Sequence, residues 1–213
     1  MIDTLWGLAL ATAAFYGLHL VPSIPGLRPR LVGWLTLRGY RSLFSLVAAA
    51  TFAWLIVAHP APYTEIWQIG SWARLIPLVV MPFALCLLIL VYTAPVEAKK
   101  IARHPMLISV LLWALAHILP NGDAGSLILF GGTALFALVD MPLADARLRR
   151  TDPAACAELA RRTSFDPFVA LAQGRAGGLD LRKVMVRGVL PAIILYLVIL
   201  FAHEFVFGFS ALP

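Results

Sequence analysis

The sequence predicts an all-α membrane protein, a polytopic bundle of about six transmembrane helices. Of its 213 residues, 61% are hydrophobic and 13% are charged, whereas a soluble domain has roughly 45–50% apolar and about 25% charged residues. A chain of this length cannot hide so much apolar side chain from water in one soluble core. The composition therefore excludes a soluble enzyme and a disordered chain. The two cysteines, Cys86 and Cys156, provide no disulfide framework of the kind found in small secreted scaffolds.

Six apolar runs reach or approach the roughly 20 residues that a helix needs to cross the hydrocarbon core. The predicted spans are 3–22, 42–59, 73–94, 104–120, 124–141 and 186–207. We expect them to form a single domain over 1–213. The turn Pro120-Asn121-Gly122-Asp123 predicts a tight antiparallel hairpin between the fourth and fifth spans, with Gly122 ending one helix in a left-handed conformation and Asp123 capping the next. Gly131-Gly132, within the fifth span, predicts the close approach of another helix.

Basic residues gather in three alternate segments between the predicted spans. Sixteen of the seventeen Lys and Arg residues lie there: Arg28, Arg30, Arg38 and Arg41; Lys99, Lys100 and Arg103; and Arg147, Arg149, Arg150, Arg161, Arg162, Arg175, Arg182, Lys183 and Arg187. The positive-inside rule makes these segments cytoplasmic, so that both termini lie on the outer side. The net charge of +6 then reflects topology, and we expect no nucleic-acid partner.

The third basic segment is the longest polar stretch. Asp152-Pro153 followed by AACAELARR predicts an N-cap, a first-turn proline and a short amphipathic helix. Such a helix is expected to lie against anionic lipid, with docking to a partner protein as the alternative. Asp140 and Asp145 flank the inner end of the fifth span and are expected to pair with Arg147 or Arg149 in solvent.

Histidine supplies the candidate chemistry inside the membrane. No Asp, Glu, Lys or Arg lies in the middle of a predicted span, which argues against an ion-coupled transporter or a proton pump. All five histidines lie within a span or at its end: His19, His59, His104, His117 and His203. A neutral imidazole is the commonest metal ligand, and haem in a helix bundle takes histidines from facing helices. The alternative for each histidine is an interhelical hydrogen bond or an interfacial position.

Topology assigns these histidines to two depths. His19 and His104 lie toward the cytoplasmic side, and His59, His117 and His203 lie toward the outer side. His104 and His117 are separated by thirteen residues, or about 20 Å of helical rise, so they cannot serve one site. Topology alone pairs His117 with His203 or His59, and His19 with His104. No Cys-x-x-Cys-His motif occurs, so any haem is expected to be bound non-covalently.

Several motifs distributed along the whole chain resemble those of a known family. They are Gly17-Leu18-His19, Arg103-His104-Pro105-Met106 leading into LWALAHILPNGD (112–123), Leu129-Phe130-Gly131, Pro167-Phe168 with Gly174-Arg175, Ala202-His203 and Phe207-Gly208-Phe209-Ser210. Together they resemble the NnrU family of bacterial inner-membrane proteins. The resemblance implies a multi-pass protein of the inner membrane, associated with denitrification and with nitrite and nitric oxide reduction. In that membrane the outer side, to which the positive-inside rule assigns both termini, is the periplasm.

The same resemblance implies a cofactor. Plant 15-cis-ζ-carotene isomerases share the domain and use a haem b whose redox state switches its histidine ligation. The ligands implied by motif are His19 and His117 here. The histidines that topology alone pairs with them, His59, His104 and His203, are a second tier of candidates. Other candidate cofactor-binding residues in these motifs are Arg103, Trp113, Asn121 and Asp123. Topology and resemblance thus favour different histidine pairs.

Three functions remain open from the sequence. The first is a haem b protein linked to nitrite or nitric oxide metabolism, or to a redox-controlled isomerisation, with a membrane reductase or electron-transfer partner. The second is a non-enzymatic scaffold or assembly factor for a reductase. The third is a membrane S-adenosylmethionine-dependent methyltransferase, because Arg-His-Pro also opens a membrane helix in isoprenylcysteine-type methyltransferases. Those enzymes carry a later Glu-Glu pair, which this sequence lacks.

Overall fold

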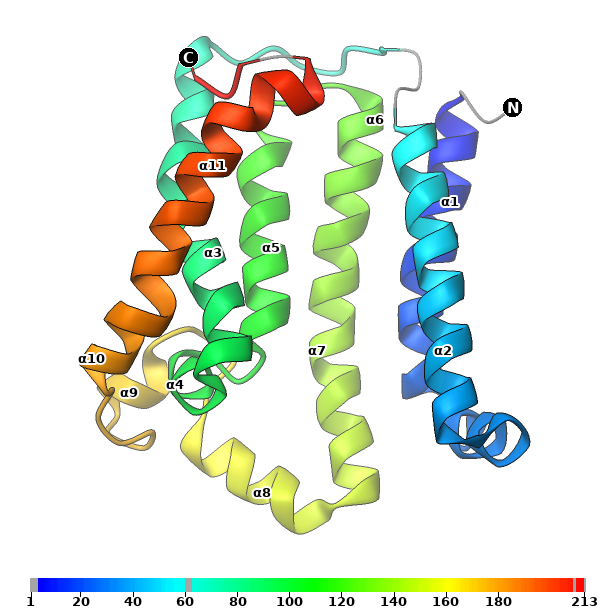
Figure 1. Cartoon of the computed structure of the whole chain (residues 1–213), viewed down its shortest axis with the longest axis vertical. Helices are drawn as coiled ribbons and strands as arrows, with labels where there is room; N and C mark the ends of the chain where they lie inside the picture. Colours follow the sequence, from blue (N-terminus) through cyan, green and yellow to red (C-terminus); the bar gives the residue numbers. More distant parts are fainter. Residues whose placement is uncertain (1–3, 60–62, 209, 213) are drawn as a thin grey trace. The chain divides into compact units, whose positions relative to one another are not determined.

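The structure, a computed structural model, describes residues 4–59, 63–208 and 210–212 (Figure 1). Residue 3, where the first predicted span begins, and Phe209 of the last motif lie outside these ranges. The chain divides into two compact units, Met1–Gln68 with Asn121–Arg147, and Ile69–Pro120 with Leu148–Pro213, and each is described by itself. The hairpin predicted between the fourth and fifth spans joins the two units and stays a prediction, as does the single domain.

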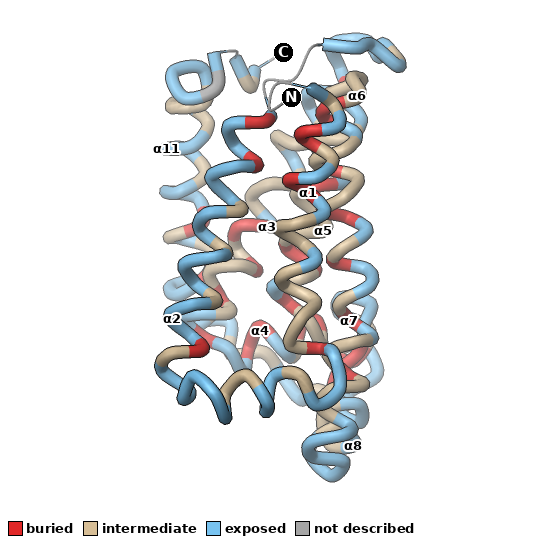
Figure 2. The backbone as a smooth tube through the Cα atoms, turned by 90° about the vertical axis from the view of Figure 1, so that its right-hand side faces the viewer, coloured by how far each residue is buried: buried red, intermediate tan, exposed pale blue. Residues whose placement is uncertain are grey.

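The expectation of about six membrane-spanning helices is confirmed. Within the described residues, five helical stretches are long and apolar enough to cross a membrane: Leu5–Ser23, Leu27–Ala58, Ser71–Thr93, Ala124–Thr151 and Leu181–Val206. The helices α4 (Pro95–Ile101) and α5 (Pro105–Ile118) form a sixth span if the pair, bent by 61°, is counted as one. Apolar side chains such as Phe83, Leu135 and Phe201 are exposed, and exposed positions predominate along α2 and α11 (Figure 2). These surfaces suit contact with a lipid bilayer.

Two helices extend beyond the predicted spans. The helix α2 begins at Leu27 rather than near residue 42, and α7 ends at Thr151 rather than near residue 141. The first basic segment, expected to be a loop, is therefore helical. Arginine is a good helix former, so charge ends the apolar run in the sequence without ending the helix.

The first unit contains α1 (Leu5–Leu20), η1 (Val21–Ser23), α2 (Leu27–Ala58), α6 (Ala124–Ser126), the π-helical turn η3 (Leu127–Gly131) and α7 (Gly132–Thr151) up to Arg147. The Thr4 Oγ1 caps α1 by accepting the Gly7 N–H at 3.1 Å. A buried cluster joins α1 to α2 through Leu8, Ala11, Leu55 and Ala58.

Gly132 lets α1 lie close to α7. A Cβ atom on Gly132 would lie 2.6 Å from the Thr12 Cγ2 atom, which is too close for any side chain. The close approach expected at Gly131-Gly132 is confirmed at Gly132.

The helix α2 is interrupted at Thr36, whose φ of 61° and ψ of 166° are non-helical. Positive φ is strained for a β-branched residue. The Thr36 Oγ1 accepts the Gly39 N–H at 3.3 Å, so the second segment of α2 starts with a side-chain cap.

Gly122 has a different role from the predicted one. The glycines with positive φ are Gly26, Gly174, Gly177 and Gly208, so the expectation of a left-handed Gly122 is wrong. Its carbonyl instead accepts the N–H groups of Ile66 at 2.8 Å and Trp67 at 3.1 Å. A Cβ atom on Gly122 would lie 1.9 Å from the Trp67 carbonyl oxygen. Glycine is required because another stretch of backbone occupies the space of a side chain.

Asp123 caps the following helix, as predicted. Its Oδ1 accepts the Ser126 N–H at 2.9 Å. The Ala124 N–H donates to the Thr64 carbonyl at 2.8 Å, and Glu65 and Asp123 form an isolated antiparallel β-bridge. The segment at 64–67 thus binds the start of α6 through backbone hydrogen bonds.

The acidic residues of α7 do not both lie in solvent. Asp145 is buried, which makes the expectation wrong for this residue. The Ser23 hydroxyl lies 3.4 Å from the Asp140 Oδ1 and 3.0 Å from the Arg147 Nη1. Ser23 therefore joins η1 to α7.

The second unit contains η2 (Ser71–Arg74), α3 (Leu75–Thr93), α4, α5, α8 (Pro153–Arg162), α9 (Val169–Ala172), α10 (Leu181–Val184), the π-helical turn η4 (Met185–Val189) and α11 (Leu190–Phe207). The helix α3 packs against both α5 and α11 (Figure 1). The Ser109 hydroxyl of α5 donates to the Ala84 carbonyl at 2.7 Å. A Cβ atom on Gly188 would lie 2.7 Å from the Leu90 Cγ, so η4 also lies close to α3.

A proline in α3 is compensated by a tyrosine of α11. Pro82 lies inside the helix and has no N–H to donate to the Leu78 carbonyl one turn earlier. The Tyr196 hydroxyl donates to this carbonyl at 3.1 Å. Because lipid offers no replacement donor, this hydrogen bond satisfies a backbone group inside the membrane.

The short helix predicted in the third basic segment is present as α8. Asp152 is its N-cap and accepts the Ala155 N–H at 2.9 Å. On its surface, Glu158 forms ion pairs with Arg161 and Arg162. The hydrogen bond from Arg161 lowers the pKa of Glu158.

We expect Gly122→Ala to destabilise the protein by about 1–3 kcal/mol, because the added methyl overlaps backbone that cannot rotate away. The free energy of unfolding in detergent measures this loss. Gly17→Ala is the matched control, since no atom lies within 4 Å of its added Cβ and alanine favours the helix. Equal stability of the two variants would contradict the assigned role of Gly122.

We expect Tyr196→Phe to lower the free energy of unfolding by about 0.6–1.5 kcal/mol, because the Leu78 carbonyl loses its donor. Adding Pro82→Ala restores a backbone donor, so the tyrosine substitution should cost less in that background. A double-mutant cycle measures the difference. Identical costs in both backgrounds would show that the hydroxyl does not compensate for the proline.

Candidate functional site

The five histidines divide between the two units. His19 and His59 belong to the first unit, and His104, His117 and His203 belong to the second. Of the pairs considered from topology and resemblance, only His117 with His203 falls within one unit.

His19 lies in the last turn of α1 with its ring orientation fixed by its own helix. Its Nδ1 is 2.7 Å from the Phe15 carbonyl oxygen. A carbonyl only accepts, so Nδ1 carries the proton and Nε2 of the neutral ring holds the lone pair. The ring lies among Phe15, Phe44 and Phe136, with centroid distances of 4.5, 5.5 and 6.0 Å. These contacts place a potential ligand nitrogen in aromatic surroundings.

A polar contact between helices lies beside His19. The Thr133 hydroxyl donates to the Leu129 carbonyl of η3 at 2.7 Å, so the Tyr16 hydroxyl is the donor in its hydrogen bond to Thr133. The Tyr16 ring stacks on Phe136 at 4.8 Å. The sequence analysis missed Tyr16, although a tyrosine within an apolar span needs a hydrogen-bond partner.

His117 repeats the geometry of His19. Its Nδ1 is 2.7 Å from the Trp113 carbonyl oxygen, four residues earlier in α5. The same reasoning makes Nδ1 the donor and Nε2 the lone-pair nitrogen. The Trp113 ring lies against the imidazole at 5.6 Å. His203, the other candidate of this unit, lies in α11.

Arg103 and His104 contact the segment that follows α8. The Arg103 guanidinium lies 4.6 Å from the centre of the Phe165 ring, and its Nε donates to the Thr163 Oγ1 at 3.1 Å. The Arg103 N–H donates to the Ser164 carbonyl at 2.8 Å. The His104 ring lies 5.3 Å from Phe165. Both residues have a structural role at the start of α5.

The later motif residues meet this same region. The Phe168 N–H donates to the Ile101 carbonyl at 2.7 Å. The Arg175 Nη1 donates to the carbonyls of Arg161 at 2.9 Å and Thr163 at 3.1 Å, next to the end of α8. Motifs that are far apart in the sequence therefore converge on one contact region.

The other candidates lie elsewhere. His59 is exposed and is the C-cap of α2. Asp123 is the N-cap of α6, and Asn121 is half-buried just before it. Within the described residues, no three His, Cys, Asp or Glu side chains gather as ligands for a metal ion.

Comparison with known sequences decides the family. A sequence model of the family described as NnrU protein matches residues 7–211, nearly the whole chain. The chain belongs to the NnrU family. Searches of curated proteins and of solved structures gave no match. Three of the NnrU-like motifs contact the segment between α8 and α9 in this chain: Arg103 binds it at Thr163 and Ser164 just before α5, the Phe168 N–H joins it to the end of α4, and Arg175 joins it to the end of α8.

We expect Arg103→Ala to loosen this part of the NnrU chain, because it removes a cation–π contact and the side-chain hydrogen bonds to Thr163. Backbone amide hydrogen exchange over 163–168 should become roughly tenfold faster. Arg182→Ala, at an exposed position of α10, is the control. Unchanged exchange in the Arg103 variant would show that Arg103 does not hold the segment.

Proposed function

We propose that this NnrU-family protein binds haem b in the bacterial inner membrane through transmembrane histidines. In this proposal it serves nitrite or nitric oxide metabolism, or a redox-controlled isomerisation, together with a membrane reductase or electron-transfer partner. Family membership and the geometry of two histidines support it.

The observation that carries the proposal is the matching hydrogen bond of His19 and His117. Each donates Nδ1–H to the carbonyl four residues earlier at 2.7 Å. Histidines that ligate metals almost always donate their other ring N–H, often to a backbone carbonyl, which fixes the tautomer and the ring orientation. Both histidines are therefore prepared to ligate through Nε2.

The neighbouring side chains fit an apolar macrocycle. Phe15, Phe44 and Phe136 surround His19, and Trp113 lies against His117. Such rings exclude water and restrict movement of the imidazoles. His19 and His117 would hold a bound haem, which would supply a redox-active iron able to bind a small ligand.

Two ligand pairs are consistent with these observations. The family resemblance implies His19 with His117, whereas the topology predicted from the sequence pairs His117 with His203, and these two belong to the same unit. His117 belongs to both pairs, so it is the first residue to test.

We expect the full chain, expressed with a haem precursor and purified in detergent, to show a Soret band that shifts on reduction with dithionite. His117→Ala should weaken haem binding at least ~10-fold and alter the band, because an axial ligand is lost. A further change in either His19→Ala or His203→Ala identifies the second ligand. His59→Ala is the control, since this residue is exposed at the end of α2.

A colourless protein, or an unchanged spectrum in His117→Ala, would overturn the haem assignment. Co-purification of a colourless chain with a reductase would favour the scaffold function. Binding of S-adenosylmethionine that is lost in His104→Ala would favour the methyltransferase function.

A further inference from the structure

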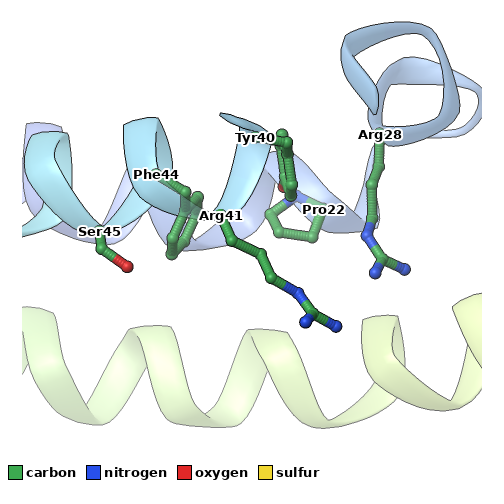
Figure 3. A pocket seen from close by; sticks show the side chains of 6 residues that line it. All are labelled: Pro22, Arg28, Tyr40, Arg41, Phe44 and Ser45. Atoms are coloured by element: carbon green, nitrogen blue, oxygen red, sulfur yellow. The ribbon is translucent and has the colours of Figure 1, made fainter. Parts of the chain in front are cut away.

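A pocket of about 320 Å³ lies in the first unit, beside the break in α2 (Figure 3). Its walls come from η1 and from both segments of α2: Pro22, Arg28, Tyr40, Arg41, Phe44 and Ser45. The volume is at the lower end of the range of small-molecule sites. Phe44 also contacts the His19 ring, but the proposed haem site gives no role to Arg28, Tyr40 or Arg41.

The break at Thr36 brings the two arginines together. Arg28 and Arg41 are thirteen residues apart in the chain, which corresponds to about 20 Å along an uninterrupted helix. The non-helical Thr36 lies between them, and both arginines line the same pocket. Figure 3 shows their guanidinium groups extending toward the same side of α2. The strained Thr36 therefore allows two arginines to line one pocket, although an uninterrupted helix would hold them about 20 Å apart.

The two guanidinium groups are not neutralised by neighbouring acids. Among the described residues, no carboxylate forms an ion pair with Arg28 or Arg41. Asp140 of α7 instead lies within hydrogen-bond distance of the Ser23 hydroxyl. The pocket thus carries positive charge that an anion could neutralise.

The Tyr40 hydroxyl provides an independent observation. Tyr40 is 8% exposed, and its buried hydroxyl has no hydrogen-bond partner among the described residues. A buried polar group left in this state costs about 1–3 kcal/mol, and buried tyrosine hydroxyls usually find a partner. A ligand in the pocket would supply the acceptor that this hydroxyl lacks.

We propose that the pocket binds the phosphate group of an anionic phospholipid. Arginine forks match phosphate oxygens in a bidentate manner, and the hydroxyls of Tyr40 and Ser45 add two donors. Pro22 and Phe44 form an apolar wall that suits the glycerol and the first acyl carbons of a lipid.

Lipid is favoured over free phosphate because the segment of α2 that carries Arg28 also carries side chains suited to the bilayer interface. Trp34, on the first segment of α2, is 81% exposed, and Leu35 beside it is also exposed. Tryptophan is enriched at the membrane–water interface, and basic pockets beside transmembrane helices are typical sites for anionic headgroups.

The test uses the full chain in phosphatidylcholine nanodiscs, with binding of short-chain phosphatidylglycerol measured by native mass spectrometry. Tyr40→Phe should weaken phosphatidylglycerol binding about tenfold, since one hydrogen bond to a charged group is lost. Arg41→Gln should weaken it at least as much. Arg38→Gln, on the same helix and exposed but outside the pocket, should bind as the unchanged chain does.

Thermal unfolding provides a second measurement. In phosphatidylcholine alone, Tyr40→Phe should unfold at the same temperature as the unchanged chain or higher, because an unsatisfied buried hydroxyl is removed. Phosphatidylglycerol should then raise the unfolding temperature of the unchanged chain more than that of the variant.

Equal binding of phosphatidylcholine and phosphatidylglycerol, or equal binding by all variants, would overturn the proposal. If inorganic phosphate displaces the lipid at a concentration below the one at which the lipid itself binds, the ligand of the pocket is free phosphate and not a lipid headgroup.

Discussion

Backbone hydrogen bonding within an apolar solvent is the constraint on which this structure depends. Lipid offers no donors or acceptors, so every peptide group at membrane depth needs a partner within the protein. Regular helices meet this requirement locally, and most of the described chain is helical. The informative places are those where the helix is imperfect. There, side chains provide the missing partners, as Tyr196 does for the carbonyl that Pro82 leaves without a donor and Thr36 does at the break in α2.

The same constraint explains which parts of the fold the sequence could predict. The membrane class and the approximate number of spans follow from apolar length, because the bilayer sets that length. The caps at Asp123 and Asp152 follow from local hydrogen bonding. The beginning of α2 at Leu27 could not be predicted from the sequence. Arginine lowers the local hydropathy and so ends an apolar run, but it is a good helix former and does not end the helix. The role of Gly122 also could not, since it depends on contact with Trp67, more than fifty residues earlier.

In the candidate site, too, contacts within one helix could be expected from the sequence, whereas contacts between residues far apart in the chain could not. The hydrogen bonds of His19 and His117 to carbonyls four residues earlier are local, so a helix carrying these histidines already permits them. The hydrogen bond between Tyr16 and Thr133 joins residues 117 positions apart, and no local pattern indicates it. Arg103 was considered as a cofactor contact from its motif alone. Its contacts with Thr163 and Phe165 give it a structural role that only tertiary packing reveals.

The compensation of Pro82 by Tyr196 has a consequence for biogenesis. The Leu78 carbonyl lies in α3, while its donor belongs to α11, which is synthesised more than a hundred residues later. During translation, α3 therefore enters the bilayer with a backbone acceptor that its own helix cannot satisfy. Until α11 arrives, that acceptor must rely on water or on the insertion machinery. The second unit consequently forms this hydrogen bond only after α11 has been made, so the insertion of α3 and the completion of its backbone hydrogen bonding are separate events.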